Sequence, residues 1–167
     1  KMMLKSTQIV VEPTGRDAKP GPFLAKADKP VLMVILAGET GRAQNWSLGG
    51  YALETNAELK TRDIVYYPNA TSCGTATATS LPCMFSPLTK DAYSYEGGLS
   101  NENLLDVLQR AGLAVLWLDN QSGCKGLCAR VDQVITRTLE DPALCSGGEC
   151  FDEIMLKDLD QRIAALD

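Results

Sequence analysis

The sequence predicts an α/β fold with a mostly parallel central sheet. Three segments indicate it: an unbroken apolar run over 31–37, an amphipathic stretch over 101–111 and a second apolar run over 113–118. Unbroken apolar runs are typical of strands covered on both faces, and parallel strands need a long connection that is usually a helix. We expect the sheet to be incomplete in this chain, because the helix predicted over 152–166, capped by Asp152, is followed by no further strand.

Two predicted strands end in polar residues that are well placed for chemistry. The run over 31–37 leads into a polar turn at 38–42, and the run over 113–118 leads into polar residues at 119–123. Ligands of open α/β sheets bind beyond the carboxyl ends of the strands. We therefore expect functional side chains in these two turns.

The predicted organisation is one domain preceded by a linker. Frequent prolines and glycines interrupt any period over residues 1–29, so this segment is predicted to be an irregular linker that holds a short strand at 8–11. Residues 30–167 form the predicted domain, and a short strand is expected within it over 64–67.

The helix boundaries follow from capping residues. The threonine-rich segment over 70–85 is expected to be a loop that leads into a helix starting near Thr75 or Ala76. Ser100 is the expected N-cap of the helix over 101–111, and Gly112 is the expected stop.

Composition excludes several classes of protein. The 167 residues include 16 Lys and Arg against 21 Asp and Glu, a net charge of −5, which argues against a nucleic-acid binder because such a protein needs a basic face. There is no His, so Ser-His-Asp, Cys-His and all-His metal sites are impossible within this chain. The longest apolar run is far shorter than the roughly 18–20 residues that span a bilayer. Chemistry confined to this chain must use carboxylates, hydroxyls, Lys, Arg or Cys.

The six cysteines form three local pairs. Six cysteines allow 15 connectivities, but the short spacing favours neighbour pairing, and structural disulfides predict an oxidising compartment. Buried or free thiols are the alternative. The three local pairs are Cys73 with Cys83, Cys124 with Cys128, and Cys145 with Cys150.

Three polar residues are candidates for chemistry. A hydroxyl such as that of Thr77, in the first turn of a helix, meets unpaired N–H groups that stabilise an anion. Glu39 follows a predicted strand and can ligate a cation, and Lys125 can contact a phosphate as a point charge. The alternatives are hydroxyls that only form caps and turns, a Glu39 that pairs with Arg42 or caps the next helix, and a solvated surface lysine.

Three motifs resemble the lipid A phosphoethanolamine transferases, a family that includes the mobile colistin-resistance enzymes. They are GETGRA at 38–43, NATSCGTATATSLPCMFS at 69–86 and GCKGLC at 123–128. A fourth motif, CSGGECFDE at 145–153, is most similar to the chromosomal members. The resemblance runs in the same order from about residue 30 to the end.

The resemblance implies a bacterial inner-membrane enzyme whose membrane domain precedes a periplasmic catalytic domain. That domain has an alkaline-phosphatase/sulfatase-like sandwich fold, and residues 30–167 would be its N-terminal part. The implied activity transfers phosphoethanolamine from phosphatidylethanolamine to a lipid A phosphate through a phospho-threonine-type intermediate. The product carries less negative charge, which confers resistance to polymyxins such as colistin. The two lipids are the implied partners, with membrane contact through the membrane domain.

Residue roles follow by motif. The resemblance makes Thr77 the nucleophile and a zinc ligand, Glu39 a second zinc ligand and Lys125 a contact to the phosphoethanolamine group. The Cys73–Cys83 bridge would clamp the nucleophile helix. In this family an Asp-His pair further along completes the zinc site, so this chain would hold a half-site and is expected to be inactive alone.

Two alternatives remain open. One is another phosphotransferase or hydrolase of the alkaline-phosphatase superfamily that acts on a different envelope acceptor. The other is a catalytically silent, disulfide-stapled binding fragment, which the absence of His favours.

Overall fold

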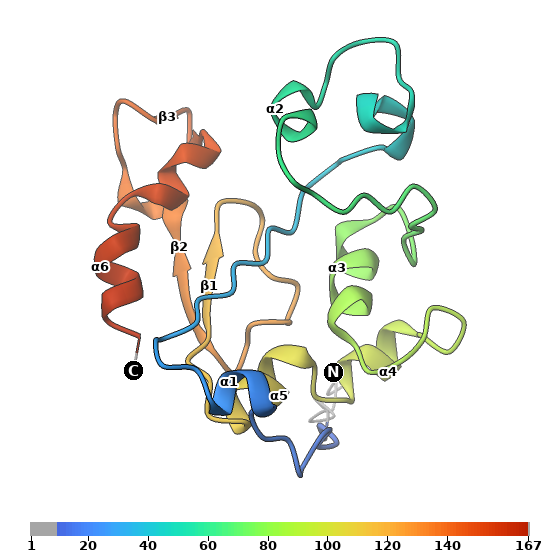
Figure 1. The fold of residues 1–167 in the computed structure, drawn as a ribbon, viewed down its shortest axis with the longest axis vertical. Coiled ribbons are helices and arrows are strands. Elements are labelled where there is room, and N and C mark those ends of the chain that lie inside the picture. Colours follow the sequence, from blue (N-terminus) through green and yellow to red (C-terminus); the bar gives the residue numbers. More distant parts are fainter. Residues whose placement is uncertain (1–9, 167) are drawn as a thin grey trace, which may run out of the picture. The chain divides into compact units, whose positions relative to one another are not determined.

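The computed structural model describes residues 10–166, which fall into two compact units (Figure 1). The first unit combines the N-terminal segment up to Val31 with the chain from Cys73 onward, and the second unit is Leu32–Ser72. The predicted domain boundary between residues 29 and 30 stays a prediction. Among the described residues, no helix has both the length and the apolar character needed to cross a bilayer.

A two-stranded parallel sheet lies in the first unit. Strands β1, Leu116–Asp119, and β2, Asp132–Ile135, pair so that Leu116 lies opposite Asp132. The connection over 120–131 is close to the shortest crossover of about a dozen residues. The run over 113–118 does form a strand, shifted to end at Asp119. The sequence pattern does not indicate β2, because that strand is short and mostly exposed.

The helices of the first unit start close to where the sequence places them, with one corrected cap. Helix α3, Thr77–Phe85, starts one or two residues after the predicted Ala76 or Thr75, and α5, Leu104–Arg110, is followed by Gly112 at a φ of 85°. Ser100 is not the cap of α5, as predicted; it ends the preceding helix α4, Tyr95–Leu99.

Asn103 caps α5 because its position allows a reciprocal capping box. The Asn103 carboxamide oxygen accepts the Leu105 N–H at 2.8 Å, and the Asp106 carboxylate accepts the Asn103 N–H at 2.8 Å. Near the other end of α5, the Arg110 guanidinium binds Glu102 and the Thr14 carbonyl.

The predicted C-terminal helix over 152–166 is wrong as one continuous element. The structure has a 3₁₀ helix η4, Asp152–Leu156, and a helix α6, Leu159–Ala164. Between them Asp158 adopts a left-handed φ of 56°, which ends one helix before the other begins. Asp152 does not cap the segment; Phe151 is the N-cap of η4.

Short elements complete the first unit. The segment that leads into η4 contains the 3₁₀ helix η3, Thr136–Leu139, and a hairpin of β3, Cys145–Ser146, and β4, Glu149–Cys150. The N-terminal segment holds the short helix α1, Pro22–Ala25, and Glu12 bridges in parallel to Asn101. Of the strand expected over 8–11, residues 8 and 9 lie outside the described residues, and 10 and 11 are not in a strand.

The strands predicted over 31–37 and 64–67 do not form. Neither segment pairs in a strand ladder, and the six large apolar residues at 31–36 are each between 48% and 85% exposed. An apolar run predicts burial, but a strand also needs neighbours that pair with its backbone. The described residues supply no such neighbour to either segment.

The second unit is built from short helical turns. Its elements are η1, Ala43–Asn45, η2, Ser47–Gly49, and α2, Ala57–Lys60. The rings of Trp46 and Tyr66 stack with centroids 6.5 Å apart. The hydroxyl of Thr55 accepts the Ser47 N–H at 3.0 Å, which ties η2 to the start of α2.

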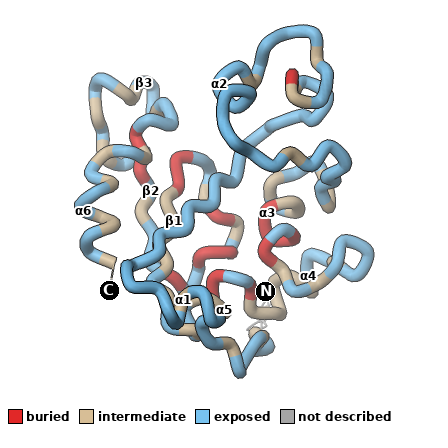
Figure 2. The backbone as a smooth tube through the Cα atoms, in the orientation of Figure 1, coloured by how far each residue is buried: buried red, intermediate tan, exposed pale blue. Residues whose placement is uncertain are grey.

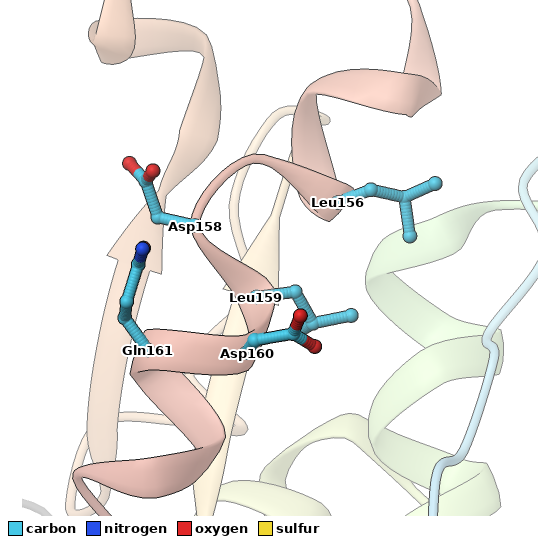
Figure 3. Close-up of a pocket in the computed structure, with 5 residues that line it drawn as sticks. All are labelled: Leu156, Asp158, Leu159, Asp160 and Gln161. Carbon is cyan, nitrogen blue, oxygen red and sulfur yellow. The ribbon is translucent and has the colours of Figure 1, made fainter.

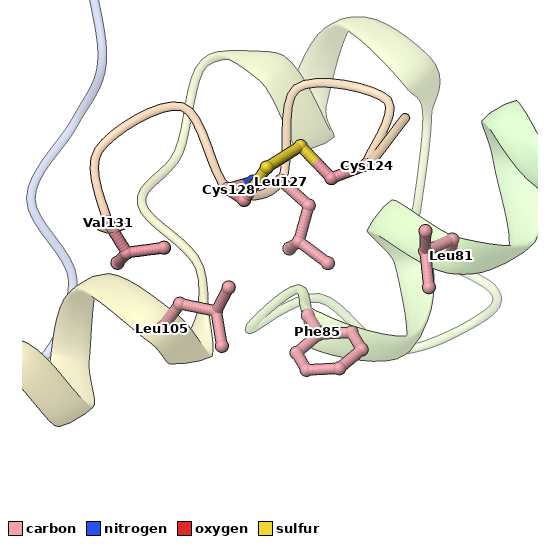
Figure 4. Packing of buried hydrophobic residues seen from close by; sticks show 7 residues of the cluster. All are labelled: Leu81, Phe85, Leu105, Cys124, Leu127, Cys128 and Val131. Carbon is pink, nitrogen blue, oxygen red and sulfur yellow. A yellow bond between two sulfur atoms is a disulfide. The ribbon is translucent and has the colours of Figure 1, made fainter. Parts of the chain in front are cut away.

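One hydrophobic core joins three parts of the first unit (Figures 2 and 4). Helix α3, helix α5 and the loop after β1 each contribute buried side chains, and Val115 and Trp117 pack against them. Figure 4 shows these side chains converging from α3, α5 and the disulfide loop. The buried members are Leu81, Phe85, Leu105, Cys124, Leu127, Cys128 and Val131.

Candidate functional site

Thr77 occupies the first position of α3. Its hydroxyl is therefore in the first turn of a helix, where the sequence analysis expected it. The N-cap is Ala76, whose side chain makes no capping hydrogen bond. Thr77 is half-buried and lies one helical turn before Leu81 and two before Phe85. Residues four apart share one face of a helix, so Thr77 lies on the side of α3 that packs into the core.

A disulfide closes the loop in front of this helix. Cys73 is bonded to Cys83, with Cα atoms 6.4 Å apart, so the segment that enters α3 is tied to its last turn. With a sequence separation of 10, the bridge contributes about 2 to 3 kcal/mol in the chain-entropy account. The conformation of the loop that positions Thr77 is thereby restricted.

Lys125 sits on a second disulfide loop. Cys124 is bonded to Cys128, with Cα atoms 5.8 Å apart, and Lys125 between them has a left-handed φ of 53°. Its ammonium donates to the Ser122 carbonyl at 2.8 Å and to the Ser122 hydroxyl at 2.6 Å. The side chain is therefore held against its own loop and is not a freely solvated lysine.

The third bridge joins Cys145 to Cys150 across the β3–β4 hairpin. All six cysteines are thus paired with their neighbours, as the sequence spacing favours.

The core brings the Thr77 helix and the Lys125 loop together. Leu81 of α3 and Leu127 of the disulfide loop belong to the same buried cluster. Glu39 lies in the second unit, in a turn where its carboxylate accepts the Thr40 hydroxyl at 3.1 Å. It does not cap the next helical turn, because Arg42 is the N-cap of η1. The metal-binding role of Glu39 stays a prediction.

The described part of the chain does not hold a complete metal site. No group of three or more Cys, Asp or Glu side chains is gathered in a geometry that holds a metal ion within residues 10–166. A catalytic zinc usually has three protein ligands. Glu39 and Thr77 supply at most two ligands. These two residues alone therefore cannot form a complete zinc site.

An ion pair beside the Lys125 loop, between the buried Asp106 carboxylate and the exposed Arg130 side chain, has no signal in the sequence. Arg130 donates to both carboxylate oxygens of Asp106, at 2.6 and 2.7 Å, and the Asn103 carboxamide donates to the Leu127 carbonyl at 2.9 Å. The spacing N-x-x-D at 103–106 is the sequence signal for the capping box of α5. The pairing of Asp106 with Arg130 has no such signal, because the two residues are distant in sequence.

Asp106 has a lowered pKa. Burial leaves only 6% of its side chain exposed and raises the pKa, but the hydrogen bonds from Arg130 and from the Asn103 N–H outweigh burial, so the pKa lies below the usual 3.8. The carboxylate is therefore ionised throughout the neutral range.

This lowered pKa predicts an acid-sensitive contribution to stability. Because the folded pKa is below the unfolded one, the stabilisation is full above about pH 4 and is lost as the pH falls through the folded value. We expect Asp106→Asn to flatten the fall in the free energy of unfolding below about pH 4. Urea denaturation at a series of pH values measures it, and an unchanged pH slope would contradict the assignment.

A pocket at the break between η4 and α6 is not part of this site (Figure 3). Five residues over 156–161 line it. Figure 3 shows Leu156 and Leu159 pointing to one side of the turn and Asp158 to the other. Of the polar residues, Asp158 and Gln161 lie on the same side and Asp160 lies beside Leu159.

The fold and these motifs define a member of the sulfatase family. The chain belongs to that family, which matches it over residues 32–167. A solved structure of the integral membrane protein lipooligosaccharide phosphoethanolamine transferase A from Neisseria meningitidis superposes with a TM-score of 0.81 and 37% identity. That likeness covers 95% of this chain and 30% of the other. The predicted alkaline-phosphatase/sulfatase-like fold class is confirmed.

Curated relatives of this chain include phosphoethanolamine transferases. The phosphoethanolamine transferase EptA of Salmonella typhimurium is 46% identical over 149 residues, which are 89% of this chain and 27% of that protein. The phosphatidylethanolamine transferase Mcr-1 of Escherichia coli is 40% identical over 144 residues, or 82% of this chain and 27% of that protein. The chain thus spans 27% of the length of these curated relatives. The resemblance to this group is confirmed.

Proposed function

We propose that the intact protein transfers phosphoethanolamine from phosphatidylethanolamine to a phosphate of lipid A. The observation that carries the proposal is the position of Thr77, at the start of a nine-residue helix whose inner face packs on the loop that holds Lys125. The similarity to named phosphoethanolamine transferases supports phosphoethanolamine as the transferred group.

The proposed reaction has two steps. The Thr77 oxygen attacks the phosphorus of phosphatidylethanolamine, an O–P bond forms, and the bond from phosphorus to the diacylglycerol oxygen breaks. Diacylglycerol leaves with a proton, and phosphoethanolamine stays on Thr77. A lipid A phosphate oxygen then attacks the same phosphorus, the bond from phosphorus to the Thr77 oxygen breaks, and that oxygen takes up the proton that the attacking phosphate gives up.

The residues of this chain stabilise charge in both steps. The N–H groups of the first turn of a helix and its dipole favour the negative charge that builds up on the phosphoryl oxygens. In this proposal the Lys125 ammonium leaves Ser122 and pairs with the same oxygens as a point charge. Phosphoryl transfer depends mainly on such positioning and charge neutralisation.

Zinc forms part of the proposal, with Glu39 and Thr77 as two ligands and the others from outside the described residues. Bound zinc would lower the pKa of a ligated hydroxyl. The described residues do not by themselves complete a metal site.

The metal assignment predicts a loss of zinc from one variant. We expect Glu39→Gln in the intact protein to lower bound zinc at least roughly tenfold, since an amide oxygen replaces a charged ligand. Elemental analysis after gel filtration measures the zinc content. Glu54→Gln is the matched control, because Glu54 pairs with Lys60 elsewhere in the same unit and should leave zinc unchanged. Equal zinc in the two variants would overturn the role of Glu39.

The proposal places this chain in the periplasmic part of an inner-membrane protein. The product gains an ammonium group, which offsets negative charge on lipid A and weakens its attraction for cationic peptides such as colistin. Disulfides support an oxidising compartment, and six cysteines are paired here.

The test is a transfer assay with the intact protein, phosphatidylethanolamine and lipid A, followed by mass spectrometry of the lipids. The expected result is lipid A that carries phosphoethanolamine, with diacylglycerol as the second product. Transfer to a different envelope acceptor would favour the related phosphotransferase, and absence of any transfer would favour the silent binding fragment.

A further inference from the structure

We propose that Asn103, Asp106 and Arg130 are positioning residues for Lys125. These three residues are called the α5 clamp below. The inference rests on the proposed function, in which Lys125 contacts the phosphoryl group. In this proposal none of the three contacts the substrate. They act on the backbone that carries Lys125.

The α5 clamp holds the Lys125 loop at two points. The Asn103 carboxamide donates to the Leu127 carbonyl at 2.9 Å, two residues after Lys125. Arg130 forms a bidentate pair with Asp106, through its Nε at 2.6 Å and Nη2 at 2.7 Å. Bidentate pairs fix direction as well as distance. The chain from 127 to 130 is therefore fastened to the first turn of α5.

The part of the loop just before these points has a conformation that needs such support. Gly123, Lys125 and Gly126 all have left-handed φ values, of 91°, 53° and 87°. For Lys125, which has a Cβ, this conformation is unfavourable and persists only where the surroundings impose it. Inside the loop the Cys124–Cys128 bridge and the bond from the Cys128 N–H to Cys124 Sγ, at 3.0 Å, add to the constraint.

The same loop forms one core with the helix that carries Thr77. Leu127 belongs to the same buried cluster as Leu81 of α3 and Leu105 of α5, so a shift of the loop backbone disturbs the core that α3 shares. A misplacement of about 1 Å is enough to impair a reaction that depends on positioning. The α5 clamp therefore determines where the Lys125 ammonium stands relative to Thr77 at the start of α3, and loosening it should weaken substrate contact as well as stability.

A double-mutant cycle in the intact protein tests this inference. The variants are Lys125→Ala, Arg130→Gln and the two combined, with kcat and KM measured for phosphatidylethanolamine. We expect Arg130→Gln to raise KM roughly 5- to 10-fold in the presence of Lys125 and to have little further effect in its absence. Equal effects of Arg130→Gln in both backgrounds would overturn the inference.

Two further variants separate positioning from stability. Arg110→Gln is the matched control, because Arg110 also forms an ion pair on α5 but binds Glu102 and not the loop. It should lower the thermal midpoint and leave KM unchanged. Asn103→Ser keeps a side-chain acceptor for the helix cap but is too short to reach the Leu127 carbonyl, so it should raise KM as Arg130→Gln does.

Hydrogen exchange gives a readout that does not require transfer. Arg130→Gln should speed amide exchange over 123–131, whereas Arg110→Gln should not. Unchanged exchange there would overturn the inference even if the wild-type protein failed to transfer phosphoethanolamine. If the wild-type protein transfers but Lys125→Ala does so equally well, the substrate role of Lys125 fails, and the positioning inference fails with it.

Discussion

Thr77→Ala in the intact protein is expected to abolish phosphoethanolamine transfer while the fold survives. Removal of the attacking oxygen leaves no nucleophile to take up phosphoethanolamine in the first step, so the transfer rate should fall by at least roughly 10³-fold. Thr77 is half-buried at the start of α3, where alanine is also a favourable residue, so little stability should be lost. Mass spectrometry of lipid A before and after incubation measures the rate.

Thr89→Ala is the matched control for this variant. Thr89 is an exposed threonine in the turn after α3, and its replacement should leave transfer unchanged. Normal modification of lipid A by Thr77→Ala would refute the nucleophile assignment. Loss of transfer accompanied by a large fall in the thermal midpoint would instead indicate damage to α3.

Phe85→Ala is expected to have the largest effect on stability. Phe85 is 5% exposed, and its ring meets Trp117 edge-on with centroids 6.1 Å apart. Truncation removes this contact and leaves a cavity between α3 and the disulfide loop, which should cost about 3 to 5 kcal/mol. The midpoint of urea denaturation should fall accordingly.

Met84→Ala is the control, because Met84 is the preceding residue of α3 and is 65% exposed. Its replacement should change stability by less than about 0.5 kcal/mol. Similar losses for the two variants would contradict the core that joins α3 to the Lys125 loop.

Local chemistry in the sequence predicted the parts of the fold that depend on neighbours along the chain. The start of α3 to within two residues, the stop at Gly112 and a strand within 113–118 all follow from nearby residues, although β1 begins only at Leu116. The neighbour pairing of cysteines such as Cys73 and Cys83 was also accessible, because short spacing limits the partners within reach.

The predictions that were wrong concern elements that depend on residues distant in sequence, or segments where two local sequence signals compete. Residues 31–37 have the composition of a buried strand, but the described residues offer no backbone to pair with them. Asn103 displaced Ser100 as the cap of α5 because it alone completes the capping box with Asp106. The helix predicted over 152–166 divides at Asp158, whose left-handed conformation no apolar period reveals.

The candidate site could be predicted as residue types but not as an assembly. The motifs indicated Thr77 and Lys125 separately, and the core then placed α3 against the Lys125 loop. The pairing of Asp106 with Arg130 spans 24 residues and leaves no periodic signal. Such contacts arise only from the packed structure.

Peptide mapping of the trapped intermediate tests the central claim most directly. The intact protein is exposed to phosphatidylethanolamine without lipid A, quenched in acid, digested and mapped by tandem mass spectrometry. The account predicts phosphoethanolamine on the hydroxyl of Thr77, lost when lipid A is added before the quench. A modified residue elsewhere, or unmodified Thr77 in a preparation that transfers the group at the normal rate, would contradict it.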